Sequence, residues 1–514
     1  MIVTSPFPHL PIPDIALTPY VLEHAASHAD KPALIDGPTG RTLTYGHLAG
    51  GIRSFAGGLS ARGFAKGDVL ALMAPNLPEY AIVFHGAALA GGIVTTINPT
   101  YTAEEVRTQL RDSGATLLVT IGMFLDTARE AAEGTGVTEI FVIGEAEGAR
   151  PVTDLLGTPL AEQVPVAADE VVVLPYSSGT TGISKGVMLS HRNLVANVAQ
   201  VIHAAQLSSD EKFIAVLPFF HIYGMTVLMN CGLRIGATII TMPRFDLEQF
   251  LSLHQEHGIT RSFVAPPIVV ALAKHPIVDT YDLSSLQQVF SGAAPLSAEL
   301  ALEAGARIGC EFVQGFGMTE MSPVSHLTPP GAFKAGSVGV TVPNTETKII
   351  DPQTGEALGI GEEGEVCVRG PQVMLGYLGN QAATEAMLEA DGWLHTGDVG
   401  RFDADGHLFL VDRLKELIKV SGFQVAPAEL EALLLTHPGI ADAAVVGAAD
   451  EHYGEVPVGF VVPRPGTELD PDEVMAFVAG RVANYKQIRR IVIVESIPKS
   501  ASGKILRRLL RDQA

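Results

Sequence analysis

The chain has 514 residues, of which 47% are hydrophobic and 18% charged, and its formal net charge is −22. This composition is typical of a compact globular protein, and the length exceeds that of one ordinary domain, so we expect two or more domains. The acidic balance argues against nonspecific binding to DNA or anionic membranes, so an anionic substrate would have to meet local basic residues.

Strand-like apolar runs alternate with helical patterns over most of the chain, and this alternation predicts largely parallel sheets covered by helices. In chain order, the expected strands are 69–73, 116–121, 139–143, 171–175, 187–189, 213–217, 237–242, 262–265, 287–291 and 311–315. The expected helices are 76–90, one ending at 132, 193–205 and 247–257.

From about Gly336 the pattern changes to short segments separated by Gly and Asp turns, which indicates an antiparallel β layer or barrel. Its expected strands are 346–350, 364–369 and 408–410. The more charged tail predicts helices at 427–435 and 472–483 and strands at 443–446, 459–462 and 490–494. We therefore expect an α/β protein with a large N-terminal body, residues 1–411, and a small α+β C-terminal domain, residues 412–514.

The cysteines and the apolar runs indicate the cellular compartment in which we expect the protein. Cys231, Cys310 and Cys367 are far apart among apolar neighbours without metal-ligand spacing, so we expect reduced, buried thiols. The proline-rich residues 1–19 do not resemble a signal peptide, and the apolar run 81–97 is too short to span a membrane. We expect a soluble cytoplasmic protein without a nucleic-acid partner or a membrane span.

A polar loop at residues 177–186 reads Ser-Ser-Gly-Thr-Thr-Gly-Ile-Ser-Lys-Gly and joins two apolar runs. Its backbone N–H groups and hydroxyls could surround a polyphosphate, because glycine lets the main chain approach phosphate oxygens closely. The spacing differs from that of the P-loop, and the loop leads into a strand-like run rather than a helix. A flexible surface turn is the alternative interpretation.

Residues 314–320, Gln-Gly-Phe-Gly-Met-Thr-Glu, form a second polar cluster directly after an expected strand. Thr319 could donate to a phosphate, and Glu320 could hold a hard cation such as Mg²⁺. The alternative is a Gly-containing turn in which both residues cap a helix.

Three further clusters occur at 393–398, 412–424 and 498–504. Asp398 follows a Gly turn, where it could be solvated or could accept bonds from two ribose hydroxyls. The second cluster alternates charged and apolar residues, which is also typical of a half-exposed hairpin. In the third, Lys504 lies in a small-residue loop that could be an exposed tail or a mobile cationic finger.

Taken together, in this order and at these separations, the clusters resemble the adenylate-forming superfamily of acyl-CoA synthetases, adenylation domains and beetle luciferases. Within it, segments 177–186 and 364–370 look most like the two signature boxes of 4-coumarate–CoA ligases, and segments 219–224 and 291–296 resemble the same subfamily. The resemblance covers residues 43–510. Ser184 departs from the proline usual at its position, which predicts a less rigid loop.

The resemblance implies a reaction in two halves. A carboxylate attacks the α-phosphate of ATP to give an acyl-adenylate and pyrophosphate, and the thiol of coenzyme A then displaces AMP. The implied catalytic residues are Lys504, Lys419, His221, Thr319 and Glu320, with Glu320 also binding Mg²⁺. The implied ATP- and AMP-binding residues are Ser177, Ser178, Gly179, Thr180, Thr181, Gly182, Lys185, Gln314, Gly315, Thr319, Asp398, Arg413, Lys415, Gln424 and Lys504.

The resemblance also implies an acyl pocket, a coenzyme A site and a hinge. The implied acyl-pocket residues are His221, Tyr223, Ala293, Ala294, Gly315, Gly317, Pro323 and Val324. Those for coenzyme A are Arg244, Lys419, Ser421 and Gly422. The small domain is expected to swing about Asp412, so that Lys504 serves the first half-reaction and Lys419 the second. Without the resemblance, His221 would be read as a hydrogen-bonded core histidine.

We therefore expect an ATP-dependent carboxylic acid–CoA ligase, with 4-coumarate or a related hydroxycinnamate as the acid. A medium-chain fatty-acyl or other aryl-CoA synthetase remains open, and so does a freestanding adenylation enzyme that loads a carrier protein. A luciferase is disfavoured because residues 220–223 look like the ligase version. A noncatalytic nucleotide sensor would have no reason to retain both Lys504 and Lys419.

Overall fold

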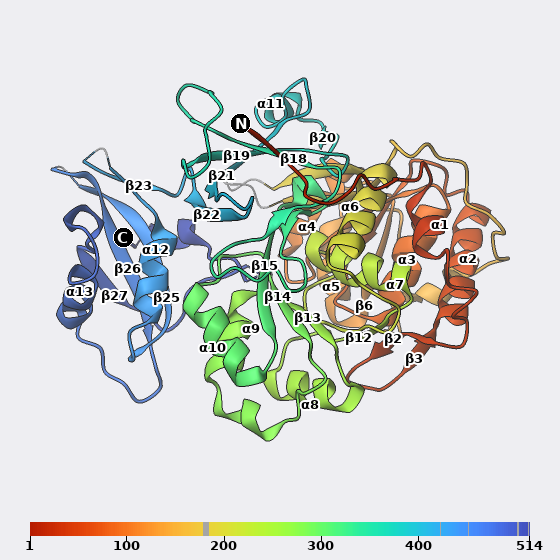
Figure 1. Cartoon of the computed structure of the whole chain (residues 1–514). Helices are drawn as coiled ribbons and strands as arrows, with labels where there is room; N and C mark the ends of the chain where they lie inside the picture. Colours follow the sequence, from red (N-terminus) through yellow and green to blue (C-terminus); the bar gives the residue numbers. More distant parts are fainter. Residues whose placement is uncertain (178–183, 422, 451, 501–502, 512) are drawn as a thin grey trace.

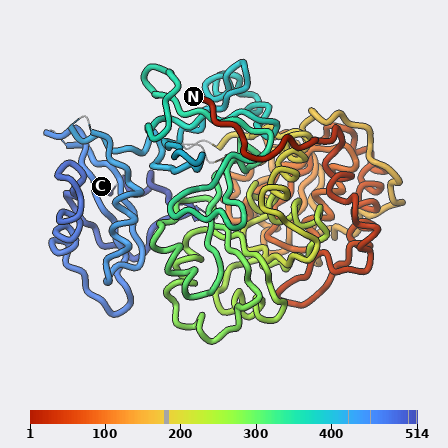
Figure 2. The backbone as a smooth tube through the Cα atoms, in the orientation of Figure 1, coloured from red at the N-terminus to blue at the C-terminus, as the bar shows by residue number. Residues whose placement is uncertain are grey.

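The computed structural model describes residues 1–177, 184–421, 423–450, 452–500, 503–511 and 513–514. Figures 1 and 2 show a large body, coloured red to green-blue, with a smaller C-terminal unit in blue at its left side. The expected class is confirmed: the body consists of mixed α/β layers, and the C-terminal unit packs helices on its own sheet.

The first sheet of the body has the strand order β20-β10-β9-β5-β4-β6-β7-β8. It is parallel from β9 to β8 and antiparallel where β9, β10 and β20 meet. Every residue of β4 is buried, because both faces of this sheet are covered. The strands are β4 (Val69–Leu72), β5 (Ile93–Thr96), β6 (Leu117–Ile121), β7 (Glu139–Ile143), β8 (Arg150–Pro151), β9 (Val171–Ser177), β10 (Lys185–Ser190) and β20 (Gly376–Tyr377).

The second sheet has the order β17-β16-β15-β14-β13-β11-β12-β2-β3 and is parallel from β15 to β2. Its strands are β2 (Pro32–Asp36), β3 (Thr42–Thr44), β11 (Lys212–Ala215), β12 (Thr238–Thr241), β13 (Arg261–Val264), β14 (Gln288–Ser291), β15 (Glu311–Gly317), β16 (Val324–Leu327) and β17 (Val340–Thr341). Because parallel strands end at one edge of a sheet, the segments after β11, β13, β14 and β15 gather there.

Helices cover these two sheets and include a π-helical segment, η3 (Gly224–Asn230), directly after Tyr223. The helices of the body are α1 (Leu17–Val21), α2 (Tyr45–Ala61), α3 (Pro78–Leu89), α4 (Ala103–Ser113), α5 (Leu125–Ala132), α6 (His191–Ala204), α7 (Cys231–Ile235), α8 (Leu247–His257), α9 (Pro266–Lys274), α10 (Ala298–Ile308) and α11 (Gln381–Glu385). No helix in the described ranges is long and apolar enough to cross a membrane.

The expected β layer is an antiparallel sheet with the order β1-β18-β19-β21-β22. Its strands are β1 (Ile2–Thr4), β18 (Glu346–Ile350), β19 (Gly364–Arg369), β21 (Leu394–Phe402) and β22 (Leu408–Arg413). The N-terminal segment supplies β1, which no local pattern predicts, because its partner β18 is more than 300 residues away in sequence.

The C-terminal unit has the strand order β24-β23-β26-β25, with β27 parallel to β26. Its elements are β23 (Ile418–Val420), β24 (Phe423–Val425), α12 (Pro427–Leu435), β25 (Ile440–Asp450), β26 (Gly454–Pro463), α13 (Pro471–Ala479), β27 (Arg490–Ile493) and α14 (Arg507–Arg511). The chain changes sheets between β22 and β23, just after Asp412. The proposed boundary at that residue stays a prediction.

Three expectations need correction. The strands expected at 443–446 and 459–462 are longer, because β25 and β26 form one extended hairpin. The helix expected to reach 483 ends at Ala479, where Gly480 follows. Of the three thiols expected to be buried, Cys231 and Cys367 are, but Cys310 is only half-buried.

Candidate active site

The polar loop at 177–186 connects two antiparallel strands. Ser177, the last residue of β9, lies opposite Lys185, the first of β10. The Ser177 hydroxyl is buried and has no hydrogen-bond partner among the described residues, so it is available to a ligand. The predicted phosphate-binding residues Ser178, Gly179, Thr180, Thr181 and Gly182 lie outside the described residues.

The next predicted cluster, 314–320, begins within β15, which extends to Gly317, and ends in a short 3₁₀ turn, Thr319–Met321, rather than at the start of a long helix. Gly317 is required here, because a Cβ atom would lie 2.3 Å from the Pro323 carbonyl oxygen. Thr319 is half-buried and Glu320 is buried. One carboxylate oxygen of Glu320 accepts a hydrogen bond of 2.7 Å from the Tyr377 hydroxyl.

Asp398 and Arg413 face each other across the β21–β22 ladder. The Arg413 Nε donates to Asp398 Oδ1 over 3.1 Å, and the Asp398 backbone N–H donates to the Thr396 hydroxyl over 3.1 Å. The Gly397 N–H donates over 3.1 Å to Glu365, in the box 364–370. The carboxylate predicted to bind ribose is therefore fixed by its own turn and by a cationic partner.

Lys504 lies in a tight turn of the C-terminal unit and reaches the body. Its N–H donates to the Ser500 hydroxyl over 3.1 Å, and its carbonyl accepts from the Ser500 N–H over 2.8 Å. A Cβ atom on the neighbouring Gly503 would lie 3.0 Å from the Ala265 Cβ and 3.6 Å from Pro267. This contact places the lysine turn against the segment that joins β13 to α9.

The charges around Lys504 come from several predicted site residues. Burial lowers the pKa of Lys504, and the nearby Arg413 lowers it further, whereas Asp398, Glu416 and Glu320 oppose this shift. Burial, together with the charge of Lys504, lowers the pKa of His221 to about 4, so this imidazole is neutral at pH 7. The structure thus brings the C-terminal lysine together with predicted residues from the body.

The predicted acyl-pocket residue Tyr223 contacts Gly292, which directly precedes the predicted residues Ala293 and Ala294. A Cβ atom on Gly292 would lie 2.8 Å from the Tyr223 ring, so these two segments touch. The Gln314 side chain accepts a hydrogen bond of 2.9 Å from the Leu296 N–H, which ties β15 to the loop after β14. Gly315 likewise has little space for a side chain, since its Cβ atom would lie 3.2 Å from the His326 carbonyl oxygen.

The other predicted pocket residues differ in exposure. Ala293 is exposed and has a positive φ of 70°, Ala294 is half-buried and Pro323 is buried. Val324 is half-buried. The Asn197 side chain donates a hydrogen bond to its carbonyl oxygen and accepts one from its N–H.

The residues predicted to bind coenzyme A lie on two different parts of the molecule. Arg244 is exposed on the body, whereas Lys419 and Ser421 are exposed on the β23–β24 hairpin of the C-terminal unit, and Gly422 lies outside the described residues. The Lys419 N–H donates to Glu455 over 2.7 Å, and the Ser421 N–H to the Tyr453 carbonyl over 2.7 Å. Two predicted nucleotide-binding residues, Lys415 and Gln424, are also exposed.

The predicted hinge residue, Asp412, is buried and holds two backbone groups. One carboxylate oxygen accepts from the Arg413 N–H over 2.7 Å, and the other from the Ala428 N–H, at the start of α12, over 2.8 Å. The carboxylate therefore connects the last strand of the body to the first helix of the C-terminal unit.

The box 364–370 contributes a cluster of Glu365, Cys367 and His395 whose ligand atoms lie within 4.8 Å of one another. His395 Nδ1 lies 3.6 Å from the Cys367 sulfur and 3.0 Å from Glu365, and its Nε2 lies 2.7 Å from Glu389. Hydrogen bonds to Cys367 and Glu365 raise the pKa of His395 to about 11. A protonated imidazole cannot ligate a metal ion, so the cluster is an ion-pair network, and Glu365 connects it to the turn at Gly397 that precedes Asp398.

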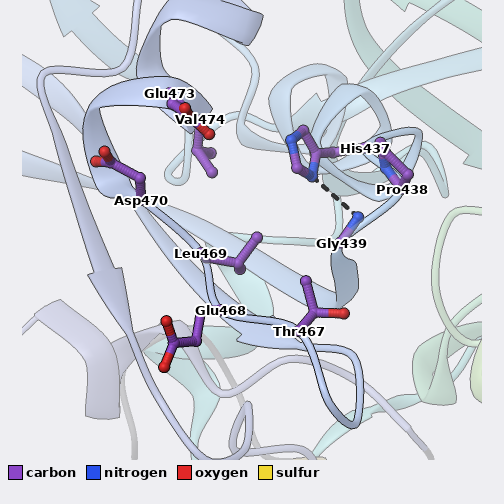
Figure 3. Close-up of a pocket in the computed structure, with 9 residues that line it drawn as sticks. All are labelled: His437, Pro438, Gly439, Thr467, Glu468, Leu469, Asp470, Glu473 and Val474. Carbon is purple, nitrogen blue, oxygen red and sulfur yellow. Dashed lines mark hydrogen bonds between the residues drawn. The ribbon is translucent and has the colours of Figure 1, made fainter.

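A separate cavity of about 300 Å³ lies in the C-terminal unit (Figure 3). Its lining includes His437 and the carboxylates of Glu468, Asp470 and Glu473, but none of the predicted site residues. Asp470 accepts from the Asp472 N–H over 2.9 Å and so caps α13. This acidic cavity is not part of the candidate active site.

Sequence reasoning missed Tyr377, which contacts two predicted site residues. Its hydroxyl donates to Glu320, and the Lys185 ammonium lies 4.9 Å from the centre of its ring. The tyrosine lies in β20, a strand too short to show a periodic pattern. Only its pairing with β10 reveals its position.

Comparisons with known proteins show the family of the chain. The family described as AMP-binding enzyme matches residues 21–378, and the one described as AMP-binding enzyme C-terminal domain matches residues 429–504. The 4-coumarate–CoA ligase 5 of Oryza sativa subsp. japonica is 45% identical over 521 residues, which cover 99% of this chain and 96% of the relative.

Two solved structures are similar along nearly the whole chain. The anthranilate CoA ligase AuaEII, in complex with anthranoyl-AMP, has a TM-score of 0.92 and 26% identity, and the match covers 98% of each chain. ATP-bound MatB from Rhodopseudomonas palustris has a TM-score of 0.88 and 28% identity, with 97% of this chain and 99% of that chain covered. This chain therefore belongs to the AMP-binding enzyme family.

Proposed function

We propose that this chain is an ATP-dependent carboxylic acid–CoA ligase that works through an acyl-adenylate and uses 4-coumarate or a related hydroxycinnamate. The observation that carries the proposal is the position of Lys504, whose charge acts together with those of Arg413, Asp398 and Glu320. A full-length relative named as a 4-coumarate–CoA ligase supports the acid, and AuaEII with anthranoyl-AMP supports the intermediate.

The nucleotide would lie between the β9–β10 loop and the β21–β22 ladder. The unpartnered Ser177 hydroxyl and Lys185 would contact the phosphates, and Asp398 and Arg413 would contact the ribose. Gln314 and Gly315 would line the adenine, and Thr319 would contact the α-phosphate. Lys415 and Gln424 are both exposed, so they would contact the nucleotide only after a local movement.

The residues at Glu320 fit a magnesium ion. Glu320 is a buried carboxylate, and Tyr377 donates a hydrogen bond to only one of its two oxygens. A carboxylate oxygen beside phosphate oxygens is the donor set that Mg²⁺ prefers. When bound, the ion would neutralise phosphate charge.

In the first half-reaction, an oxygen of the acid attacks the α-phosphorus, and the bond from this phosphorus to the bridging oxygen of pyrophosphate breaks. The step brings anions together, so positioned cations lower its barrier. Lys504 would hold the acid carboxylate next to the phosphate, and neutral His221 would orient the acid without repelling Lys504. Tyr223 and Gly292 would bound the ring of the acid.

In the second half-reaction, the sulfur of coenzyme A attacks the acyl carbonyl carbon, and the bond to the AMP oxygen breaks. Lys419 and Ser421 are exposed on the β23–β24 hairpin, so we expect the C-terminal unit to move about Asp412 to bring them to this chemistry. Arg244 would then contact the nucleotide end of coenzyme A.

The Lys504→Ala variant tests this division of roles. We expect the rate of adenylation, measured as pyrophosphate release, to fall about a hundredfold or more. The reason is that one charge-assisted donor is worth about 3 kcal/mol in the transition state. Thioester formation from supplied acyl-adenylate should be unchanged. Lys486→Ala is the matched control, because that lysine pairs with Glu429 on the same unit. An equal loss in both half-reactions of Lys504→Ala would contradict the assignment.

A panel of carboxylic acids with ATP, Mg²⁺ and coenzyme A tests the substrate class. We expect AMP and thioester to form fastest with 4-coumarate and its relatives. A preference for octanoate would move the chain to the fatty-acyl branch, and pyrophosphate release without thioester would indicate a carrier-protein acceptor. We also propose that the protein acts in the cytoplasm.

A further inference from the structure

We infer that Tyr377 is a positioning residue for the adenylation step, because it fixes the phosphate-loop lysine and the metal-binding carboxylate to each other. The inference rests on the proposed function and extends it to a residue outside the predicted set.

The backbone around Tyr377 joins the two polar segments of the site. The Met374 N–H donates to the Glu320 carbonyl over 2.8 Å, and the Leu378 N–H donates to the Gly186 carbonyl over 2.8 Å. Between them, Tyr377 pairs with Val187 of β10. The strand β20 is therefore a bridge from the turn at Glu320 to the first residues after the phosphate loop.

The Tyr377 side chain makes a second connection between the same segments. Its hydroxyl donates to Glu320 Oε1 over 2.7 Å, and the face of its ring lies 4.9 Å from the Lys185 ammonium. The residue is only 3% exposed, so neither contact competes with bulk water. The Tyr377 N–H donates to the Thr384 hydroxyl over 2.9 Å, which fixes the start of the side chain.

The two contacts restrain different groups. A buried carboxylate without partners is costly, and a single donor on one oxygen leaves the other oxygen able to bind a cation. The ring face attracts the ammonium and restricts the flexible stem of Lys185.

These contacts predict separable effects for two variants. Tyr377→Phe keeps the ring and removes the donor to Glu320, so we expect about tenfold more Mg²⁺ for half-maximal adenylation, with kcat at saturating Mg²⁺ nearly unchanged. Tyr377→Leu also removes the ring face, so the KM for ATP should rise as well. Thioester formation from supplied acyl-adenylate should be unchanged in both variants.

A binding measurement gives a readout that does not depend on turnover. Calorimetric titration of each protein with a nonhydrolysable ATP analogue, at several Mg²⁺ concentrations, should show weaker Mg²⁺-dependent binding in Tyr377→Phe. Tyr80→Phe is the matched control, because the Tyr80 hydroxyl is buried in the body without a partner among the described residues.

The outcomes separate this inference from the proposed function. If the wild-type enzyme forms acyl-adenylates but Tyr377→Phe matches Tyr80→Phe in Mg²⁺ dependence, the positioning role is wrong. Equal loss of both half-reactions in Tyr377→Phe, with a lower thermal midpoint, would make the tyrosine merely structural and would also overturn the inference. If the wild-type enzyme forms no acyl-adenylate with any acid, the proposed function itself fails.

Discussion

Single residues set the shape of the acyl pocket, and Gly292 is the clearest case. A Cβ atom at this position would lie 2.8 Å from the Tyr223 ring, and a tyrosine ring cannot bend away as a flexible chain end would. We expect Gly292→Ala to displace the ring and to raise the KM for the acid about tenfold, since overpacking costs on the order of 1–3 kcal/mol. The KM for ATP should not change, and steady-state kinetics with each substrate varied would check this. Parallel increases in both KM values would show that the contact does not belong to the acid site alone.

At this scale, the sequence motifs identified Lys504, Asp398 and Arg413, and the structure places these residues together. Asp398 and Lys504 could be found because each directly follows a glycine in a polar segment, and Arg413 because it lies in the charged cluster 412–424. Tyr377 could not be found in this way, since an aromatic residue within an apolar run is usually a core residue. Its importance depends on two partners that lie far from it in sequence.

Among the helices, α2 shows why some elements escaped prediction. Its glycines suggest a loop, but two of them allow the backbone of residues 155–158 to approach the helix closely. The helices α8 and α12 were predicted with their observed bounds, because a capping Asp246 with Gly258 marks the first and Pro427 the start of the second. Local signals of this kind are visible in the sequence, whereas a close contact between distant backbones is not.

Two glycines of α2 give a test at the level of this helix. A Cβ atom on Gly57 would lie 1.8 Å from the Thr158 carbonyl oxygen, whereas one on Gly50 would have no neighbour within 4 Å. We expect Gly57→Ala to lower the free energy of unfolding by about 1–3 kcal/mol or more, and Gly50→Ala to raise it by about 0.5–1 kcal/mol. Thermal unfolding of the two variants would check the opposite signs. A stable Gly57→Ala protein would mean that residues 155–158 can move away without loss.

Across the whole molecule, the two half-reactions are expected to need different placements of the C-terminal unit, so they should depend differently on pH. Adenylation needs the Lys504 ammonium, whose pKa is lowered by burial, and its rate should fall on the alkaline side below the usual range of lysine. His221 has a pKa of about 4, well below the ordinary histidine value of 6.5. Its titration should therefore not lower the adenylation rate near pH 6.5. Thioester formation from supplied acyl-adenylate should lack the Lys504 limb.

The check is a pair of pH–rate profiles at constant ionic strength, together with the Lys504→Arg variant. Because a guanidinium stays protonated, this variant should lose the alkaline limb of adenylation even if its rate is lower. An unchanged limb in Lys504→Arg would assign the titration to another group.

The ionic groups around Lys504 have one more consequence, which concerns how a nucleotide can enter. Arg413, Asp398, Glu416 and Glu320 act on Lys504, Arg413 pairs with Asp398, and Arg507 pairs with both Glu416 and Glu431. These groups are three cations and four carboxylates, in a protein whose overall charge is −22. Such a site holds no surplus of positive charge for a bare triphosphate. We therefore expect the site to bind ATP best when a divalent cation already neutralises part of the phosphate charge. Chelation of divalent cations should then weaken the binding of ATP as well as slow the reaction.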